Sequence, residues 1–215
     1  MAADLPALVT PDTTVVVLVE AQRGVVGDQP ALPELAAAVA EVGAVERMAR
    51  LAEVARGAGV RVVHATAQNL PGGFGANRNA RLFAAVRRAG VENVAGTPAT
   101  APVPELGPDP DDIVLARYHG LSPLADGSLD ALLRNEGVTT VVVAGVSLNV
   151  AIPHLVFEAV NRSYQVVVAT DAVAGVPVDY GQQVMRHSLS VVATLATTDE
   201  LVAAWRSTGT PVDLS

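Results

Sequence analysis

The sequence predicts an α/β domain of three layers, with helices on both faces of a parallel sheet. Short runs of valine, isoleucine, leucine and alanine recur along the chain, and strands that are apolar throughout are typical of sheets buried on both faces. Segments with apolar residues at every third or fourth position separate these runs, as in amphipathic helices. This alternation favours parallel pairing with right-handed crossovers, and therefore an αβα architecture.

Six strands are expected, and together they predict a six-stranded parallel sheet of Rossmann-like type. They are placed at Thr14–Glu20, Val60–Thr66, Asp112–Arg117, Thr139–Gly145, Tyr164–Thr170 and Val191–Thr197. Helices are expected between and after these strands. They are placed at Leu35–Ala58, Asn79–Ala89, Leu129–Glu136, Val150–Arg162, Tyr180–Ser190 and Asp199–Ser207.

The helix at Leu35–Ala58 shows the helical spacing most clearly. Its apolar stripe consists of Leu35, Val39, Val42, Val45, Met48 and Leu51. Charged residues such as Glu41 and Arg47 are then left to face water. Gly57 and Gly59 are suited to a C-terminal cap, so the helix is expected to end there.

Two segments are expected to be long loops. Asn69–Asn77 is rich in glycine, and Ala95–Asp111 is rich in proline. Loops of this length inside a compact domain usually form lids, binding loops or subunit contacts. No internal repeat or linker divides the chain, so residues 1–215 are expected to form a single domain.

Composition narrows the class of function. The 215 residues carry a net charge of −8, and an acidic protein is a poor partner for nucleic acid. Apolar runs such as Val15–Val19 are too short to cross a bilayer, and the N-terminal residues lack a signal-peptide pattern. The sequence has no cysteine, which excludes disulfides, thiolate metal sites and cysteine nucleophiles and fits a cytoplasmic protein.

Neither a metal nor a cofactor is expected. No pair of histidines or of aspartate and histidine has metal-ligand spacing near a strand end. The glycines Gly72, Gly73 and Gly75 neither follow a strand directly nor open a helix, so they do not form a dinucleotide-binding loop. His64 and His154 are expected to pack in the structure.

Ligands of open α/β sheets bind at the carboxyl ends of the strands, so polar residues there are the candidates for a site. They are Glu20, Gln22 and Arg23 after the first strand, Arg117, Tyr118 and His119 after the third, and Ser147 and Asn149 after the fourth.

Two interpretations of the charged candidates are open. Glu20 follows a buried apolar run, where a carboxyl group can serve as a general acid, or it closes the strand by pairing with Arg23 or Arg117. Arg117 either binds a substrate carboxylate or is the structural partner of Glu20. Ser147 lacks the setting of a nucleophilic serine and is expected to be a turn or capping residue.

Three stretches together resemble one family. The first strand ends in VLVEAQ, the third leads into VLARYHGLSP, and the fourth leads into GVSLNVA, followed by a helix and the strand end TDAVAG. These stretches resemble the isochorismatase-like hydrolases, also called cysteine hydrolases, which include nicotinamidases and N-carbamoylsarcosine amidases. The resemblance covers nearly the whole chain, and the fourth stretch is its most specific part.

The resemblance implies a catalytic site at Glu20, Arg117 and Ala151, but each position departs from the family pattern. Glu20 stands where the family has aspartate, Ala116 or Arg117 where it has lysine, and Ala151 where it has the nucleophilic cysteine. The resemblance also implies a cis peptide bond at Val146–Ser147. An alanine methyl group cannot attack a carbonyl carbon, so the covalent amidase route of the family is excluded.

The expected function is hydrolysis of a small molecule without a cysteine nucleophile. By analogy with the isochorismatases of this family, Glu20 would act as the acid or base on a vinyl ether. Substrate-binding roles are assigned to the neighbouring polar residues Gln22, Tyr118, His119, Ser147 and Asn149.

Two other interpretations remain. The chain is alternatively an inactive family member that binds a small molecule or a partner, or a hydrolase with a relocated nucleophile such as Ser147. A homodimer or homotetramer is expected, with the Ala95–Asp111 loop and the apolar helix Val150–Val160 as docking surfaces. An open cavity with Glu20 pointing into it favours an enzyme, whereas Glu20 locked to Arg117 in a collapsed site favours an inactive relative.

Overall fold

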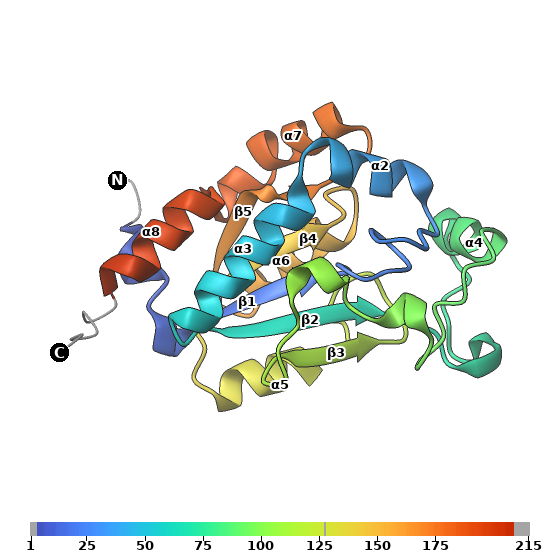
Figure 1. Cartoon of the computed structure of the whole chain (residues 1–215), viewed down its shortest axis with the longest axis horizontal. Helices are drawn as coiled ribbons and strands as arrows, with labels where there is room; N and C mark the ends of the chain where they lie inside the picture. Colours follow the sequence, from blue (N-terminus) through green and yellow to red (C-terminus); the bar gives the residue numbers. More distant parts are fainter. Residues whose placement is uncertain (1–3, 127, 209–215) are drawn as a thin grey trace.

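The computed structural model describes residues 4–126 and 128–208 and shows the predicted three-layer α/β architecture (Figure 1). Six parallel strands form one sheet in the order β3-β2-β1-β4-β5-β6. The strands are β1 (Thr14–Val19), β2 (Arg61–Ala67), β3 (Ile113–Arg117), β4 (Thr140–Val146), β5 (Gln165–Ala174) and β6 (Thr194–Ala196).

Eight α-helices accompany the sheet in the part of the chain that the structure describes. They are α1 (Leu5–Leu8), α2 (Pro33–Glu41), α3 (Ala44–Gly57), α4 (Arg81–Arg88), α5 (Ser128–Asn135), α6 (Ala151–Asn161), α7 (Val178–His187) and α8 (Thr198–Thr208). None of these helices combines the length and the apolar character that a membrane crossing requires.

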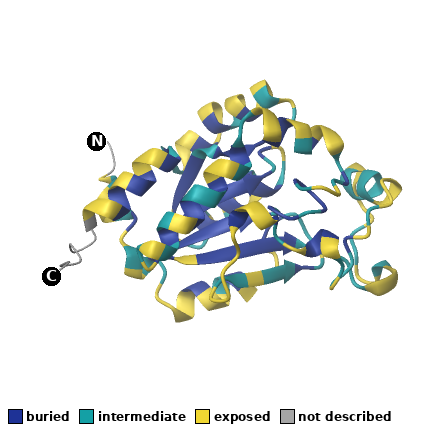
Figure 2. Ribbon diagram, viewed as in Figure 1, coloured by how far each residue is buried: buried dark blue, intermediate teal, exposed yellow. Residues whose placement is uncertain are grey.

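Two apolar clusters, one on each face of the sheet, form the core. Met48 and Leu51 of α3 and Trp205 of α8 pack with Leu18 of β1 on one face. Side chains of α5, α6 and α7 pack with Val17 and its neighbours on the other face. Figure 2 shows the central strands β1 and β4 as buried along their whole length, which is why their sequences are apolar in both alternating sets of positions, whereas the edge strand β3 is partly exposed.

The strand order reverses beside β1, and this reversal positions the site. The chain runs outward from β1 through β2 to β3, then returns to pair β4 with the other side of β1. The loops after β1 and β4 therefore leave the sheet in opposite directions and open a crevice between them. Glu20 follows β1 and Ser147 follows β4, so both lie at this crevice.

One predicted helix is two helices in the structure. The sequence predicts a single helix over Leu35–Ala58, but α2 ends at Glu41 and α3 begins at Ala44. Gly43 between them has φ +63°, in the left-handed region that ends a helix and that glycine adopts at little cost. The apolar stripe continues across this break, which is why the spacing alone does not reveal it.

Two smaller differences concern the ends of strands and the surface of α6. β6 is shorter than the predicted strand at Val191–Thr197 because residues Leu189–Val191 form a 3₁₀ helix. The apolar residues of α6 that were expected to offer a docking surface are largely in the core, since Ile152 and Leu155 are fully buried. Phe157, at 42% exposure, is the large apolar side chain of α6 that remains on the surface.

The two predicted loops fold back toward the crevice. The glycine-rich loop contains a 3₁₀ turn at Pro71–Gly73, and the proline-rich loop contains turns at Pro98–Thr100 and Pro104–Leu106. A bridge between Asn69 and Val94 holds the first loop beside the chain that follows α4. A second bridge, between Gln22 and Pro102, holds the proline-rich loop beside the chain that follows β1, so both loops are fixed near the carboxyl ends of β1 and β2.

Candidate functional site

A cavity of about 340 Å³ lies at the carboxyl ends of the strands, at the predicted edge of the sheet. Eight residues were assigned a catalytic or substrate-binding role, and the structure brings seven of them to the wall of this cavity. They are Glu20, Arg117, Tyr118, His119, Ser147, Asn149 and Ala151. A cavity of this size suits a small organic ligand.

Glu20 is held in one position by the backbone of the sheet. It leaves β1 with φ +51°, and its N–H donates a hydrogen bond of 2.8 Å to the carbonyl oxygen of Ala65 in β2. A positive φ is uncommon for a residue other than glycine and is found mostly at functional turns. This turn directs the carboxylate to the wall of the cavity.

Arg117 is the partner of Glu20. As the last residue of β3, it donates a hydrogen bond from Nη2 to Oε1 of Glu20 at 2.5 Å. The side chains of Glu20 and Arg117 are 18% and 10% exposed, so the pair is largely shielded from bulk solvent. The other terminal nitrogen of Arg117, Nη1, is buried and has no hydrogen-bond partner among the described residues.

Two residues at the end of β3 were candidates for the cationic position. Arg117, and not Ala116, meets the carboxylate and lines the cavity. The sequence contains no lysine at all, since all 14 of its basic residues are arginine. A guanidinium group stays protonated where a lysine amine can lose its proton, so this pair cannot shuttle a proton through its cation.

The turn after β4 carries the cis peptide bond that the resemblance implies, between Val146 and Ser147. The carbonyl oxygen of Ser147 then accepts hydrogen bonds from Val150 and Ile152 at 3.1 Å each, which starts α6. Ala151 is the first residue of α6, is 4% exposed and lines the cavity. Val150, the residue before α6, makes no capping hydrogen bond with its side chain.

The side chains of two predicted binding residues, Asn149 and Gln22, are hydrogen-bonded to the backbone of other segments. The amide of Asn149 donates to the carbonyl oxygen of Val176 at 2.5 Å and accepts from its N–H at 2.8 Å, which fastens the turn to the chain after β5. Gln22 is fully buried and does not line the cavity. Its amide bonds to both backbone groups of Ala67 and to the carbonyl oxygen of Ala99, so Gln22 ties β1 to β2 and to the proline-rich loop.

The structure adds wall residues that sequence patterns do not single out. One group is polar and comes from loops: Gln68, Asn69, Asn77 and Asn93. Another is apolar and comes from α2, α4 and nearby turns: Val25, Leu32, Leu35, Leu82, Phe83 and Val86. The amphipathic spacing of α4 was a signal that this helix covers something apolar, but only the fold shows that it covers the cavity.

One stretch of the chain that contributes to the cavity wall is basic, although the protein as a whole is acidic. Residues 54–91 contain no aspartate or glutamate but six arginines: Arg56, Arg61, Arg78, Arg81, Arg87 and Arg88. Arg87 of α4 lines the cavity and donates a hydrogen bond to the carbonyl oxygen of Asn77 at 3.3 Å. Glu20 and Glu34 also line the cavity, so charges of both signs lie on its wall.

His64, expected to pack, lies away from the cavity. It is 1% exposed, and its Nε2 lies 2.9 Å from Oδ2 of Asp112, which also binds Arg56 at 2.7 Å. Burial lowers the pKa of His64, although the Asp112 carboxylate opposes that effect. Among the described residues, no three histidine, cysteine, aspartate or glutamate side chains gather as a metal site would require.

A parallel sheet with a cavity at its switch point defines the class: a three-layer α/β protein with a cavity at the carboxyl ends of its strands, the place where ligands of open α/β sheets bind. Residues 14–200 match the model of the isochorismatase domain. The chain is also 32% identical over 190 residues to a ureidoacrylate amidohydrolase RutB of Methylorubrum extorquens, covering 80% of this chain and 75% of that protein.

Solved structures share this fold. A cysteine hydrolase from Pseudomonas syringae superposes with a TM-score of 0.78 at 22% identity, covering 93% of this chain and 95% of that chain. An isochorismatase family protein from Desulfovibrio vulgaris superposes with a TM-score of 0.77 at 25% identity, covering 90% of this chain and 98% of that chain. The chain therefore belongs to the isochorismatase family of hydrolases.

Proposed function

We propose that this protein hydrolyses a small carboxylate-bearing molecule without a covalent intermediate, with Glu20 as the acid–base group. The observation that carries the proposal is the Glu20–Arg117 pair on the wall of an open cavity whose expected nucleophile position holds Ala151. The family relatives include a ureidoacrylate amidohydrolase, but a thiolate is needed for the covalent amidase route. A vinyl ether is the substrate that suits a site with a carboxyl group and no sulfur.

The chemistry requires one proton carrier. A protonated Glu20 gives its proton to the terminal carbon of the vinyl ether, which leaves an oxocarbenium ion. Water adds to that cation and returns a proton to Glu20, and the resulting hemiketal breaks down to a ketone and an alcohol. No bond to the protein forms at any stage, so the methyl group of Ala151 only has to leave room for the substrate.

Arg117 would couple binding to this proton transfer. In the structure the guanidinium of Arg117 is bonded to the carboxylate of Glu20. A substrate carboxylate that binds Arg117 would compete for this guanidinium and would lie beside Glu20. Substrate binding would therefore release Glu20 from its partner next to the bond on which it acts.

The test is turnover of isochorismate and of simpler carboxylated vinyl ethers by the purified protein and by Glu20→Gln. Removing a general acid typically lowers kcat by about a hundredfold or more. Glu20→Asp is the matched control, because it keeps the carboxyl group and shortens its reach by one methylene. Equal kcat values for the wild type and Glu20→Gln would remove Glu20 from the mechanism.

A second function, binding of a small molecule without catalysis, is favoured by the hydrogen bond between Glu20 and Arg117. Glu20 and Arg117 are already bonded to each other, and all three catalytic positions of the family are substituted here, so an inactive protein that binds a small molecule fits the same geometry. A thermal-shift screen with aromatic acids and amides would separate the two. Ligands that raise the Tm while no vinyl ether is turned over would establish binding without catalysis.

We further propose that the protein acts in the cytoplasm as a homodimer or homotetramer. A chain without cysteine suits a reducing compartment. Val191 is 76% exposed and Phe157 is 42% exposed, and exposed apolar side chains of this kind are often covered in an assembly. Size-exclusion chromatography with light scattering tests the assembly, and a monomer mass at micromolar concentration would contradict it.

A further inference from the structure

Asn93 is a buried amide that the proposed reaction does not use. It lies between α4 and the proline-rich loop, is 6% exposed and lines the cavity. Its side-chain oxygen, Oδ1, is buried and has no hydrogen-bond partner among the described residues. Buried polar groups in native proteins are almost always paired, so an unpaired one at a cavity wall points to a missing partner.

The backbone around Asn93 is fixed, so the amide is not merely a loose loop residue. Its N–H donates to the carbonyl oxygen of Val91 at 3.0 Å, and its carbonyl oxygen accepts from Asn69 at 2.6 Å. The neighbouring residue Val94 forms a bridge with Asn69. Asn93 therefore lines the cavity from a position held on both sides.

Gly24 makes room for this amide. A Cβ atom at position 24 would lie 2.0 Å from Oδ1 of Asn93 and 2.9 Å from the carbonyl oxygen of Ala99. No residue with a side chain fits there unless Asn93 moves. Gly24 also lines the cavity, so the amide of Asn93 packs against a glycine backbone beside the wall.

Arg117 supplies the complementary group. Among the described residues, three buried side-chain atoms have no hydrogen-bond partner. Two of the three, Oδ1 of Asn93 and Nη1 of Arg117, belong to residues that line this cavity. The first can only accept a hydrogen bond and the second can only donate one. A ligand that satisfies both must carry an acceptor and a donor.

We infer that Asn93 is a specificity-determining residue that accepts a hydrogen bond from an N–H or O–H group of the substrate, while Arg117 binds the substrate carboxylate. The inference rests on the proposed function, because it takes the cavity to be the substrate site. It adds that the substrate bears a hydrogen-bond donor besides its carboxylate. Sites built to pair with such a donor strongly reject analogues that lack it.

The test uses matched probes that differ in the donor alone. They are the 2-, 3- and 4-carbamoylbenzoates and the three corresponding methyl esters, which keep the carboxylate and the ring but replace the amide N–H₂ with a methoxy group. The three isomers sample different spacings between the two groups. Titration calorimetry with the full chain gives a Kd for each probe.

In the wild type we expect at least one carbamoylbenzoate to bind about tenfold or more tightly than its ester, the usual effect of one buried hydrogen bond. Asn93→Leu and Asn93→Ala should bring this ratio close to one and leave the Kd of the ester nearly unchanged. Asn93→Leu should also unfold at the same or a higher urea concentration, because it removes an unpaired buried group. Asn79→Ala, an exposed asparagine outside the cavity wall, should leave the ratio as it is.

The outcomes separate the inference from the proposed function. If amides and esters bind equally well to the wild type, or if the ratio survives in both Asn93 variants, the role of Asn93 is refuted and the carboxylate site stands. If none of the six probes binds, the carboxylate site fails as well and the inference fails with it.

Discussion

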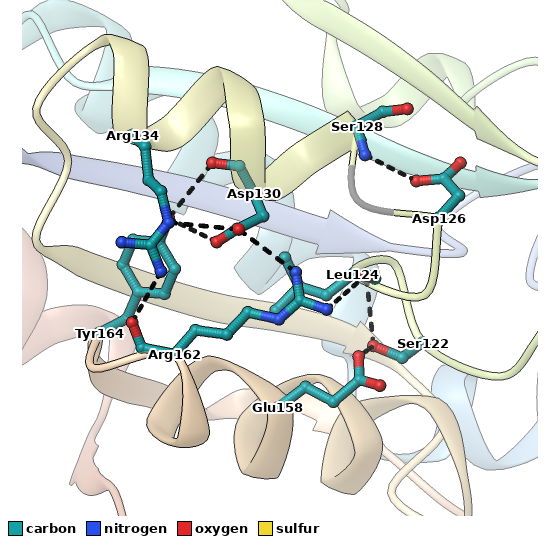
Figure 3. Close-up of polar contacts among 9 residues, drawn as sticks. All are labelled: Ser122, Leu124, Asp126, Ser128, Asp130, Arg134, Glu158, Arg162 and Tyr164. Atoms are coloured by element: carbon teal, nitrogen blue, oxygen red, sulfur yellow. Dashed lines mark hydrogen bonds and ion pairs between the residues drawn. The ribbon is translucent and has the colours of Figure 1, made fainter.

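Two polar clusters of this molecule differ in how completely their groups are paired. In the Asp130 cluster, which joins α5 to α6 and β5, the carboxylate of Asp130 accepts hydrogen bonds from Arg134 at 3.2 Å and Tyr164 at 3.0 Å and pairs with Arg162 at 3.4 Å (Figure 3). In the cavity, Glu20 has a side-chain hydrogen bond with Arg117, and Nη1 of Arg117 is left unpaired.

The two arginines of the Asp130 cluster also donate hydrogen bonds to backbone carbonyl oxygens. Arg162 donates to the carbonyl oxygen of Leu124 at 3.0 Å, and Arg134 donates to that of Arg162 at 3.0 Å (Figure 3). Burial alone would raise the pKa of Asp130, but the hydrogen bonds from Tyr164 and Arg134 hold it below its usual value. A cluster with every group paired stabilises the fold, whereas one with a spare donor is suited to bind a ligand.

The largest expected effect is a loss of ligand binding when the Glu20–Arg117 pair loses its cation. Arg117→Met should weaken the binding of benzoate by about a hundredfold, because a charge-assisted hydrogen bond contributes up to about 3 kcal/mol. Titration calorimetry measures the change. Arg186→Met, at an exposed arginine of α7, is the control, and an equal loss in both variants would show that the effect is a general one of charge.

A large effect on stability is expected when the Asp130 cluster loses the carboxylate that its other members share. Asp130→Ala should lower the free energy of unfolding by about 2 kcal/mol, because three partners lose a partly buried acceptor at once. Benzoate binding should not change. Urea denaturation measures the loss, with Asp126→Ala as the control, since Asp126 accepts one exposed hydrogen bond from Ser128 (Figure 3). Equal losses for the two variants would contradict the cooperative role of Asp130.

His64 supplies a third case, because its Nδ1 is buried without a partner among the described residues and His64 does not line the cavity. Its pKa is lowered by burial, so the unfolded chain binds a proton first as the pH falls. Stability should be full above about pH 6.5, the ordinary pKa of histidine, and should decrease below it, by about 1.4 kcal/mol for each unit of pKa lowering. Urea titrations at pH 7.5 and 5.5 measure this, and a loss of equal size in His64→Gln would assign it to other groups.

The smallest effect is expected from trimming the paired cluster. Tyr164→Phe removes one hydrogen bond to Asp130, whose partners Arg134 and Arg162 remain. The free energy of unfolding should fall by about 0.5–1 kcal/mol. A loss as large as that of Asp130→Ala, measured in the same urea titrations, would mean that the tyrosine and not the carboxylate organises the cluster.

Most of the fold follows from local sequence patterns. The strands β1 and β4 lie within one residue of their predicted ends, because buried parallel strands are apolar throughout and their ends are marked by polar residues. The break at Gly43 escaped prediction because the apolar stripe crosses it without a change of spacing. Whether a glycine adopts a positive φ depends on how the two helices pack, which periodicity does not show.

The site was predictable where it lies at strand ends and unpredictable where it comes from loops. Glu20, Arg117 and Ala151 meet because parallel strands end at one edge of the sheet. The position of Gln22 predicts a binding residue, but its amide is hydrogen-bonded to the backbone of Ala67 and Ala99. Asn93 carries no local signal, since its burial depends on Gly24 and on loops distant in sequence.

The alanine that begins α6 has a consequence for durability. None of the residues around the cavity is cysteine or methionine, so peroxide finds no soft atom there to oxidise. A thiol-dependent enzyme of this fold loses its reactive group when that atom is converted to a sulfinic or sulfonic acid. The present cavity is exempt from that damage and should keep its properties under oxidative stress.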